Sequence, residues 1–205
     1  MTDSERVIVF GVLKSSKDYS DAIIKANKIN SRNGPFSALI LFTKSIKYYS
    51  SVVTPDIQTY ILADDFDASN DDTLCLKENI TLPINEKVTI FNTKFGVLKT
   101  KKGITLAWFQ GTNDNKSTDD AIKLLKPYAP IDIFLSKYYP KNIFRGVTNI
   151  DEDEKMFLGC HETDLVTEAI IPRYHFVSHT IDDDNDFLEK NSKNISSFCE
   201  RPPYY

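Results

Sequence analysis

The chain has 205 residues, of which 41% are hydrophobic and 26% charged, and its formal net charge is -4. This length suits one domain with a full hydrophobic core, so we predict a single domain over residues 1–205. The acidic balance argues against general electrostatic adhesion to nucleic acid or to an acidic membrane, and it leaves specific contacts open.

The cysteines and the amino terminus indicate the compartment. Cys75, Cys160 and Cys199 are odd in number and widely spaced, and Met1 is followed by a polar run rather than by a signal peptide. No apolar stretch approaches the roughly 20 residues that cross a bilayer. We therefore predict a soluble protein of a reducing compartment, with no membrane partner.

The first segments predict a parallel strand-helix-strand unit. The apolar runs Val7–Phe10 and Ala38–Phe42 are separated by a helix-sized segment. Ser16 or Asp18 is the expected N-cap of that helix, and Gly34 marks its end. Its apolar face is predicted from spacings of three and four residues: Tyr19, Ala22, Ile23 and Ala26.

A third strand, Ile57–Leu62, runs into the acidic segment Asp64–Asp67. Three carboxylates within four positions have the look of a metal site, and the alternative is a solvated acidic loop. From Lys87 to Phe109 the pattern changes to short apolar runs with turn residues between them, which favours an antiparallel arrangement. These runs are Val88–Phe91, Phe95–Leu98 and Ile104–Phe109.

The second half predicts two further helices and two further strands. Ser117–Asp120 has the form of a capping box that begins a helix, and another helix is expected around Asp164–Ile170. Ile131–Leu135 reads as a buried strand whose carboxyl end carries Ser136 and Lys137. Pro172–His179 is the last strong strand. Ligands of open α/β sheets collect at the carboxyl ends of strands, so those ends are where a site is expected.

A two-metal phosphoesterase needs several Asp, His and Asn ligands that converge at strand ends. Only the third and the last predicted strands offer such ligands, because the others end in lysine, threonine, serine or aliphatic residues. The five ends are Gly11–Lys14, Phe42–Lys44, Asp64–Asp67, Ser136–Lys137 and His179–Ile181.

Three segments resemble degraded motifs of the RNA lariat debranching enzyme, a calcineurin-like metallophosphoesterase: Tyr60–Ser69, Ile131–Pro140 and Pro172–His179. The sequence is more similar still to the amino-terminal domain of the CwfJ family of splicing proteins, in which Pro172–Phe176 and Glu200–Tyr204 have near-identical counterparts. The resemblance implies the calcineurin-like metallophosphoesterase fold, a layered α/β sandwich with mixed parallel and antiparallel sheets. It also implies that the chain is an amino-terminal fragment that lacks the carboxyl-terminal CwfJ domains.

Carried over by position, the resemblance implies that the metal site is lost. The degenerate metal-site positions are Val12, Lys14, Thr43, Asp65, Phe66, Lys137, His179 and Ile181. Lysine ammonium groups would stand where cations should bind, which is electrostatically unfavourable. We therefore expect no catalytic residue, no bound metal and no cofactor, and a pseudoenzyme rather than an enzyme.

By the same resemblance, the expected partners are the RNA lariat debranching enzyme and the late intron-lariat spliceosome, in the nucleus or also in the cytoplasm. The expected role is protein interaction that promotes lariat turnover. Alternatives are a residual single-metal phosphodiesterase at Asp65, Asp67 and His179, or lariat RNA binding by Lys14, Lys44 and Lys137 gathered at one rim. Cys160 and His161 have the residue types of a nucleophile and a base, but adjacent side chains on a strand or helix point apart, which argues against such a pair. His175 is expected to be a structural histidine.

Overall fold

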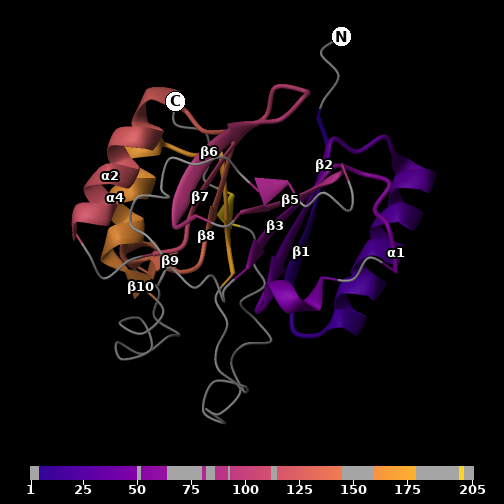
Figure 1. Ribbon diagram of the computed structural model, residues 1–205. Helices are drawn as coiled ribbons and strands as arrows, with labels where there is room; N and C mark the ends of the chain where they lie inside the picture. Colours follow the sequence, from indigo (N-terminus) through magenta and orange to yellow (C-terminus); the bar gives the residue numbers. More distant parts are fainter. Residues whose placement is uncertain are drawn as a thin grey trace. The chain divides into compact units, whose positions relative to one another are not determined.

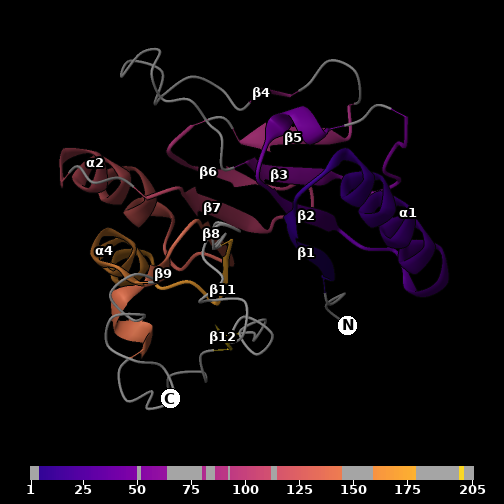
Figure 2. The same cartoon turned by 90° about the horizontal axis from the view of Figure 1, so that it is seen from below.

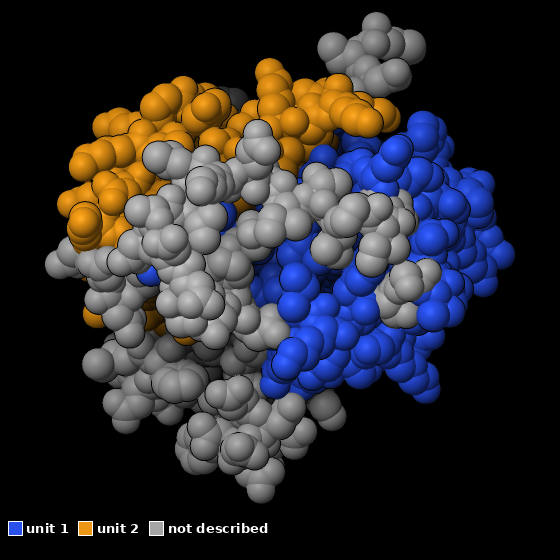
Figure 3. Space-filling model, viewed as in Figure 1, with its two compact units in different colours: residues 1–94 blue, residues 95–205 orange. Residues whose placement is uncertain are grey.

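The computed structural model describes residues 5–49, 52–63, 80–81, 86–91, 93–111, 115–144, 159–178 and 199–200. The chain divides into two compact units, Met1–Lys94 (unit 1) and Phe95–Tyr205 (unit 2), which are coloured separately in Figure 3. The prediction of one domain over 1–205 stays a prediction. Within the described residues, no helix is both long and apolar enough to cross a membrane.

Unit 1 contains a five-stranded sheet, which we call sheet A. Its order is β1-β2-β3-β5-β4, and every neighbouring pair is parallel except β4 with β5 (Figure 1). The strands are β1 (Val7–Leu13), β2 (Ala38–Thr43), β3 (Thr59–Ala63), β4 (Ile80–Thr81) and β5 (Val88–Phe91). Helix α1 (Ser16–Asn33) joins β1 to β2, and the short 3-10 turn η1 (Ile46–Tyr48) follows β2. The predicted parallel strand-helix-strand unit is confirmed.

The prediction of an antiparallel segment from Lys87 onward is wrong at its first strand. Val88–Phe91 pairs in parallel with β3, with Thr59 opposite Val88. All four of its residues are buried, as is usual for parallel strands covered on both faces. The other neighbour of β5, the two-residue strand β4, is antiparallel to it, and the predicted antiparallel pairing of consecutive runs is found in β6 and β7 of unit 2.

Helix α1 begins one residue earlier than the sequence predicted. Ser15 is its N-cap, and the Ser15 hydroxyl accepts the backbone N–H of Asp18 at 3.1 Å. The expected caps, Ser16 and Asp18, lie inside the helix instead. The predicted stop is confirmed, because Gly34 is the C-cap and its N–H donates to Asn30 O at 2.8 Å.

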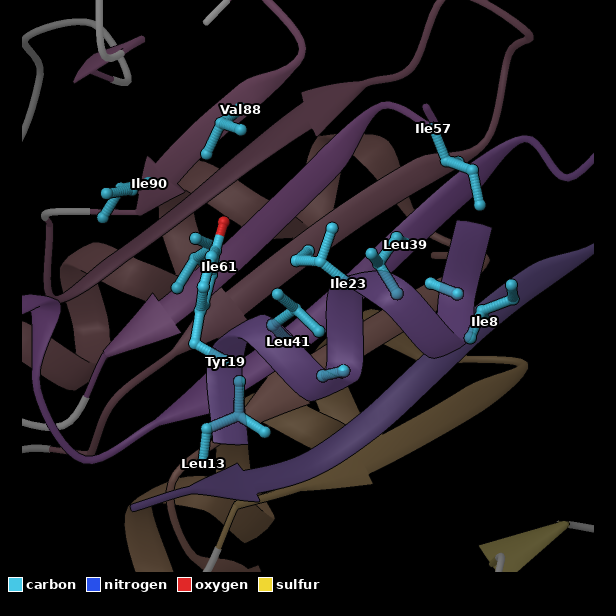
Figure 4. Packing of buried hydrophobic residues seen from close by; sticks show 12 residues of the cluster. Ile8, Leu13, Tyr19, Ile23, Leu39, Leu41, Ile57, Ile61, Val88 and Ile90 are labelled. Carbon is cyan, nitrogen blue, oxygen red and sulfur yellow. The ribbon is translucent and has the colours of Figure 1, made fainter. Parts of the chain in front are cut away.

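The core of unit 1 lies between α1 and one face of sheet A (Figures 2 and 4). Tyr19 and Ile23 of the helix pack against strand residues of that face, such as Leu41 and Ile61. All four predicted residues of the apolar helix face are buried. All six residues of β2 are buried. The loop that follows β2 at its carboxyl end therefore begins from a tightly packed strand.

Unit 2 contains a second five-stranded sheet, sheet B, of order β12-β11-β8-β7-β6. Its central pairs β7–β8 and β8–β11 are parallel, and its outer pairs β6–β7 and β11–β12 are antiparallel. The strands are β6 (Phe95–Lys99), β7 (Thr105–Phe109), β8 (Ile133–Ser136), β11 (Tyr174–Val177) and β12 (Cys199–Glu200). Two mixed sheets with a helix layer confirm the predicted mixed α/β class.

The helices of unit 2 begin earlier than predicted. Helix α2 (Asn115–Leu125) starts two residues before Ser117, and α4 (His161–Ile170) starts three residues before Asp164. A polar first turn carries little apolar periodicity, so the pattern locates the buried face better than the start. The two helices lie side by side in Figures 1 and 2. Smaller elements are η3 (Lys126–Tyr128), β9 (Tyr139–Pro140), η4 (Lys141–Phe144) and β10 (Gly159–Cys160).

Candidate functional site

The carboxyl ends of β1 and β2 lie next to each other, because the two strands are parallel neighbours. A register shift between Phe10 and Val12 precedes this edge, so that Val12 pairs with Phe42 and Leu13 with Thr43. The Lys44 N–H donates to Leu13 O at 3.1 Å and joins the two strand ends. Four predicted positions, Val12, Lys14, Thr43 and Lys44, therefore lie at one edge of sheet A.

The Thr43 hydroxyl is hydrogen-bonded to the backbone at this edge. It lies 3.0 Å from Ser45 O and 3.3 Å from Leu13 O, to which it donates, and it accepts the Ser45 N–H at 3.3 Å. Thr43 is only 4% exposed. An aspartate at residue 43 would turn acceptor oxygens toward two carbonyl oxygens in a buried place, where an unpaired charge is strongly unfavourable.

Lys14 belongs to the start of α1 rather than to a ligand set. Its backbone N–H donates to Asp18 Oδ2 at 3.0 Å, which ties the residue before the N-cap to the first turn of the helix. The residue is exposed, and Val12 beside it has no side-chain donor or acceptor atom. Neither position supplies an atom that binds a divalent cation.

Lys137 follows β8 directly, as predicted, at the carboxyl edge of sheet B. Its N–H donates to Phe109 O at 3.3 Å, and its ammonium lies 5.6 Å from the centre of the Tyr138 ring. The same ring occupies the space above Gly111, whose φ is +79° and where a Cβ atom would lie 2.7 Å from Tyr138 Cδ2. Lys137 lies in unit 2 and the other two lysines in unit 1, so a common rim of the three cations stays a prediction.

Ser136 and His175 form a hydrogen-bonded pair that the sequence did not reveal. Their strands β8 and β11 are parallel neighbours, and Ser136 Oγ lies 2.8 Å from His175 Nε2. The Ser136 hydroxyl donates its proton to Tyr138 O at 2.7 Å, so His175 Nε2–H is the donor to Ser136 Oγ.

A serine nucleophile needs the opposite arrangement, with its proton directed at a basic imidazole nitrogen. Ser136 is also fully buried. His175 packs on the Phe134 ring at a centroid distance of 4.6 Å. Both contacts support the expected structural role of His175, and only the register between two strands could have revealed its partner, 39 residues away.

Cys160 is the N-cap of α4, and its thiol donates to Glu162 Oε2 at 3.0 Å. Burial raises the pKa of the Cys160 thiol, and the hydrogen bond from Cys160 lowers the pKa of the Glu162 carboxyl. The thiol is therefore protonated at neutral pH, whereas a nucleophile must be a thiolate. The thiol proton goes to Glu162 and His161 is exposed, which agrees with the sequence-based argument against a nucleophile–base pair of these two residues.

The remaining predicted positions, Asp65, Phe66, His179 and Ile181, lie outside the described residues, as does the acidic segment 64–67. Among the residues that are described, no group of three or more His, Cys, Asp or Glu side chains is placed to hold a metal ion. The described positions of the predicted site, a valine, an engaged threonine and two lysines, do not fit a pair of divalent cations.

Comparisons with known proteins agree with part of the resemblance. No family model matches the chain. The sequence is 26% identical over 200 residues to "CWF19-like protein DRN1" of Saccharomyces cerevisiae (strain ATCC 204508 / S288c). The match covers 93% of this chain and 35% of that protein, so the chain spans about a third of the length of this curated relative.

Among solved structures, a novel archaeal phosphodiesterase is similar over 64% of this chain and 72% of its own length. The identity is 16% and the TM-score 0.34. The similarity to a CWF19-like protein therefore extends over nearly the whole length of this chain.

Proposed function

We propose that this chain is a catalytically inactive, metallophosphoesterase-like interaction domain of a splicing factor. Its partners would be the RNA lariat debranching enzyme and the late intron-lariat spliceosome, and it would promote the turnover of intron lariats in the nucleus. Two facts support the proposal: the similarity to a CWF19-like protein along 93% of the chain, and the chemistry of the strand ends in sheet A.

The observation that carries catalytic inactivity is the hydrogen bonding of Thr43. In the resemblance, residue 43 is the position of the carboxylate that bridges two metal ions. Here a neutral hydroxyl at that position is hydrogen-bonded to Leu13 and Ser45, and its side chain is buried away from solvent. The Thr43 oxygen already accepts a backbone N–H, and its proton is directed at backbone carbonyl oxygens. Such a hydroxyl is a poor ligand for a hard cation.

The activity test uses the purified chain and a synthetic RNA with a 2′–5′ branch, with Mg²⁺, Mn²⁺, Zn²⁺ or Fe²⁺ supplied in turn. We expect no cleavage above the buffer control over hours. Turnover that EDTA abolishes, and that a His179→Ala variant loses, would establish the residual single-metal phosphodiesterase instead. A Cys160→Ala variant is the matched control, because its thiol is not a candidate ligand in that alternative.

The partner test measures binding of the same chain to purified debranching enzyme by calorimetry or interferometry, in the absence of RNA. We expect a saturable complex of one chain with one enzyme. No complex at micromolar concentrations of both proteins would contradict the interaction role. That outcome would leave catalytic inactivity untouched, because the two tests share no reagent other than the chain itself.

A further inference from the structure

The strands of sheet B have a second edge, opposite the carboxyl edge that carries Lys137. Because β7, β8 and β11 are parallel, their amino ends lie together at this edge. Contacts between the strand starts show it directly: the Thr105 N–H donates to Asp132 Oδ2 at 2.9 Å, and the Arg173 guanidinium lies 3.4 Å from Asp132 Oδ1. The Tyr174 N–H in turn donates to Asp132 O at 3.1 Å.

The hairpin that joins β6 to β7 turns at the same edge, since Lys99 pairs with Thr105 (Figure 1). Its tip is held by three hydrogen bonds. The Thr100 N–H donates to Ile104 O at 2.8 Å, the Gly103 N–H to Thr100 O at 2.9 Å, and the Ile104 N–H to Thr100 Oγ1 at 3.0 Å. Gly103 takes a φ of +98° to close the turn. The exposed Lys101 and Lys102 therefore project from a fixed backbone.

Cations gather at this edge although the whole chain carries a net charge of -4. In the part of the chain that the structure describes, no carboxylate lies within 4.0 Å of Lys99, Lys101 or Lys102. Lys126 is a further exposed cation, at the start of η3, which leads into β8. The acids here are Asp132, which is engaged by Arg173 and by a backbone N–H, the exposed Glu168 near the end of α4, and Glu200 of β12, which lies opposite Tyr174 in the strand register.

Two tyrosine rings are exposed on the segments that lead into β8 and β11. Tyr128 ends η3 with 54% of its surface exposed, and Tyr174 begins β11 with 45% exposed. The η3 turn packs against α4, and the Ile131 N–H donates to Ile170 O at 3.2 Å. This hydrogen bond joins the segment that follows Tyr128 to the segment that precedes Tyr174. An exposed tyrosine ring offers a flat face on which an unpaired base can stack.

We infer that this surface binds a single-stranded nucleic acid. The amino-edge surface consists of Lys99, Lys101, Lys102, Tyr128, Arg173 and Tyr174. Lysine and arginine side chains neutralise backbone phosphates, and the tyrosine rings stack on unpaired bases, a combination that is typical of single-strand binding without strict sequence preference. The inference does not rest on the proposed function, because none of these residues belongs to the degenerate metal-site positions.

The test measures the fluorescence anisotropy of a labelled oligouridine of about 12 nucleotides, mixed with the full chain at low salt, with oligothymidine and a duplex as further probes. We expect micromolar binding of both single strands and weaker binding of the duplex, whose stacked bases the tyrosines cannot reach. The variant Lys99→Glu, Lys101→Glu, Lys102→Glu should lose at least tenfold in affinity. The slope of log affinity against log salt concentration should also become shallower by about 2, because each of the three lost phosphate contacts contributes roughly 0.7 on a single strand.

The matched control changes three exposed cations of α1 in unit 1: Lys17→Glu, Lys28→Glu and Arg32→Glu. It alters the net charge equally and should change the affinity less than twofold. Should the hairpin variant fail to fold by circular dichroism, Lys101→Gln with Lys102→Gln removes the two turn cations without touching a strand, and a loss of several-fold is expected.

The rings are tested separately. Tyr128→Ala with Tyr174→Ala should weaken binding about tenfold, whereas the two Phe variants should bind within about threefold of the unchanged chain, because stacking needs the ring and not the hydroxyl. Three outcomes would overturn the inference: no binding of either single strand, an equal loss in the α1 control, or displacement of the RNA by an equimolar polyglutamate peptide. The last outcome would assign the surface to an acidic protein segment.

Discussion

At the scale of single residues, the buried hydroxyl of Thr43 should contribute measurably to the stability of the fold. Replacing Thr43 by Val removes the hydroxyl's hydrogen bonds to Ser45 O and Leu13 O and the one that it accepts from the Ser45 N–H, and it should lower the free energy of unfolding by about 1–3 kcal/mol. Replacing it by Asp should lower that free energy further, because a carboxylate would be buried against carbonyl oxygens. Urea denaturation at pH 7 measures both changes. An Asp variant as stable as the unchanged chain would contradict the assignment of Thr43 as a backbone-bonded residue.

A second residue, Tyr19, is buried, and its hydroxyl has no hydrogen-bond partner among the described residues. Burial, and to a lesser extent the neighbouring Tyr49, raises the pKa of Tyr19 above its usual range. We expect Tyr19→Phe to stabilise the protein by about 1 kcal/mol at pH 7, because the variant no longer buries an unpaired hydroxyl. The exposed Tyr128→Phe, as a control, should change stability by less than about 0.5 kcal/mol.

Because its pKa is raised, Tyr19 should make the folded state less stable as the pH rises into the alkaline range. The unfolded tyrosine ionises near pH 10, whereas the folded one stays protonated, so the folded state binds more protons in that range. The contribution of Tyr19 to stability is complete below pH 10 and declines as the pH rises above it. Tyr19→Phe should therefore lose less stability than the unchanged chain between about pH 9 and 11. A parallel loss in the two proteins would show that Tyr19 ionises as freely when folded as when unfolded.

At the scale of elements, the start of α1 depends on one hydroxyl. Ser15→Ala should lower the free energy of unfolding by about 1 kcal/mol, because the Asp18 N–H loses its partner. Ser16→Ala should change it by less than about 0.5 kcal/mol, since Ser16 is the first residue inside the helix. Thermal denaturation followed by circular dichroism distinguishes the two variants. A larger loss of stability in Ser16→Ala than in Ser15→Ala would show instead that Ser16 is the N-cap, as the sequence pattern suggested.

The packing of the β6–β7 hairpin requires a glycine at residue 96. Gly96 lies opposite Trp108, and a Cβ atom on Gly96 would clash with the Trp108 ring at Cζ2. Gly96→Ala should therefore destabilise unit 2 by about 1–3 kcal/mol through overpacking. Gly11→Ala is the matched strand control, because a Cβ atom added there would meet no described atom within 4 Å, and we expect it to be neutral or slightly stabilising. Differential calorimetry of both variants would test this.

At the scale of the whole molecule, the proposed inactivity predicts how the protein responds to metal ions. A site filled at 100 times its dissociation constant would stabilise the folded state by about 2.7 kcal/mol, which for a chain of this size is a rise in Tm of roughly 5–10 °C. We expect a change of less than about 1 °C with Mn²⁺ or Zn²⁺ relative to an EDTA-treated sample. A dose-dependent rise would mean that the chain does build a metal site.

Long periodic or fully apolar segments were predictable along the chain. The runs at 38–42, 88–91 and 131–135 became β2, β5 and β8 within a residue or two at each end, because burial on both faces demands such composition. The apolar face of α1 was predicted residue by residue for the same reason. The two-residue strands β4, β9, β10 and β12 were not predicted, since two residues carry no period.

The sequence by itself determined the mixed α/β class, the strand ends that carry Thr43, Lys44, Ser136 and Lys137, and the residue types at the degenerate positions, because these depend on local composition and order along the chain. Only the tertiary structure decided the partners: β5 pairs in parallel with β3, His175 is hydrogen-bonded to Ser136, and the Thr43 hydroxyl is hydrogen-bonded to Leu13 and Ser45. Strand register and hydrogen-bond direction arise between segments that are distant along the chain, where no local pattern specifies them.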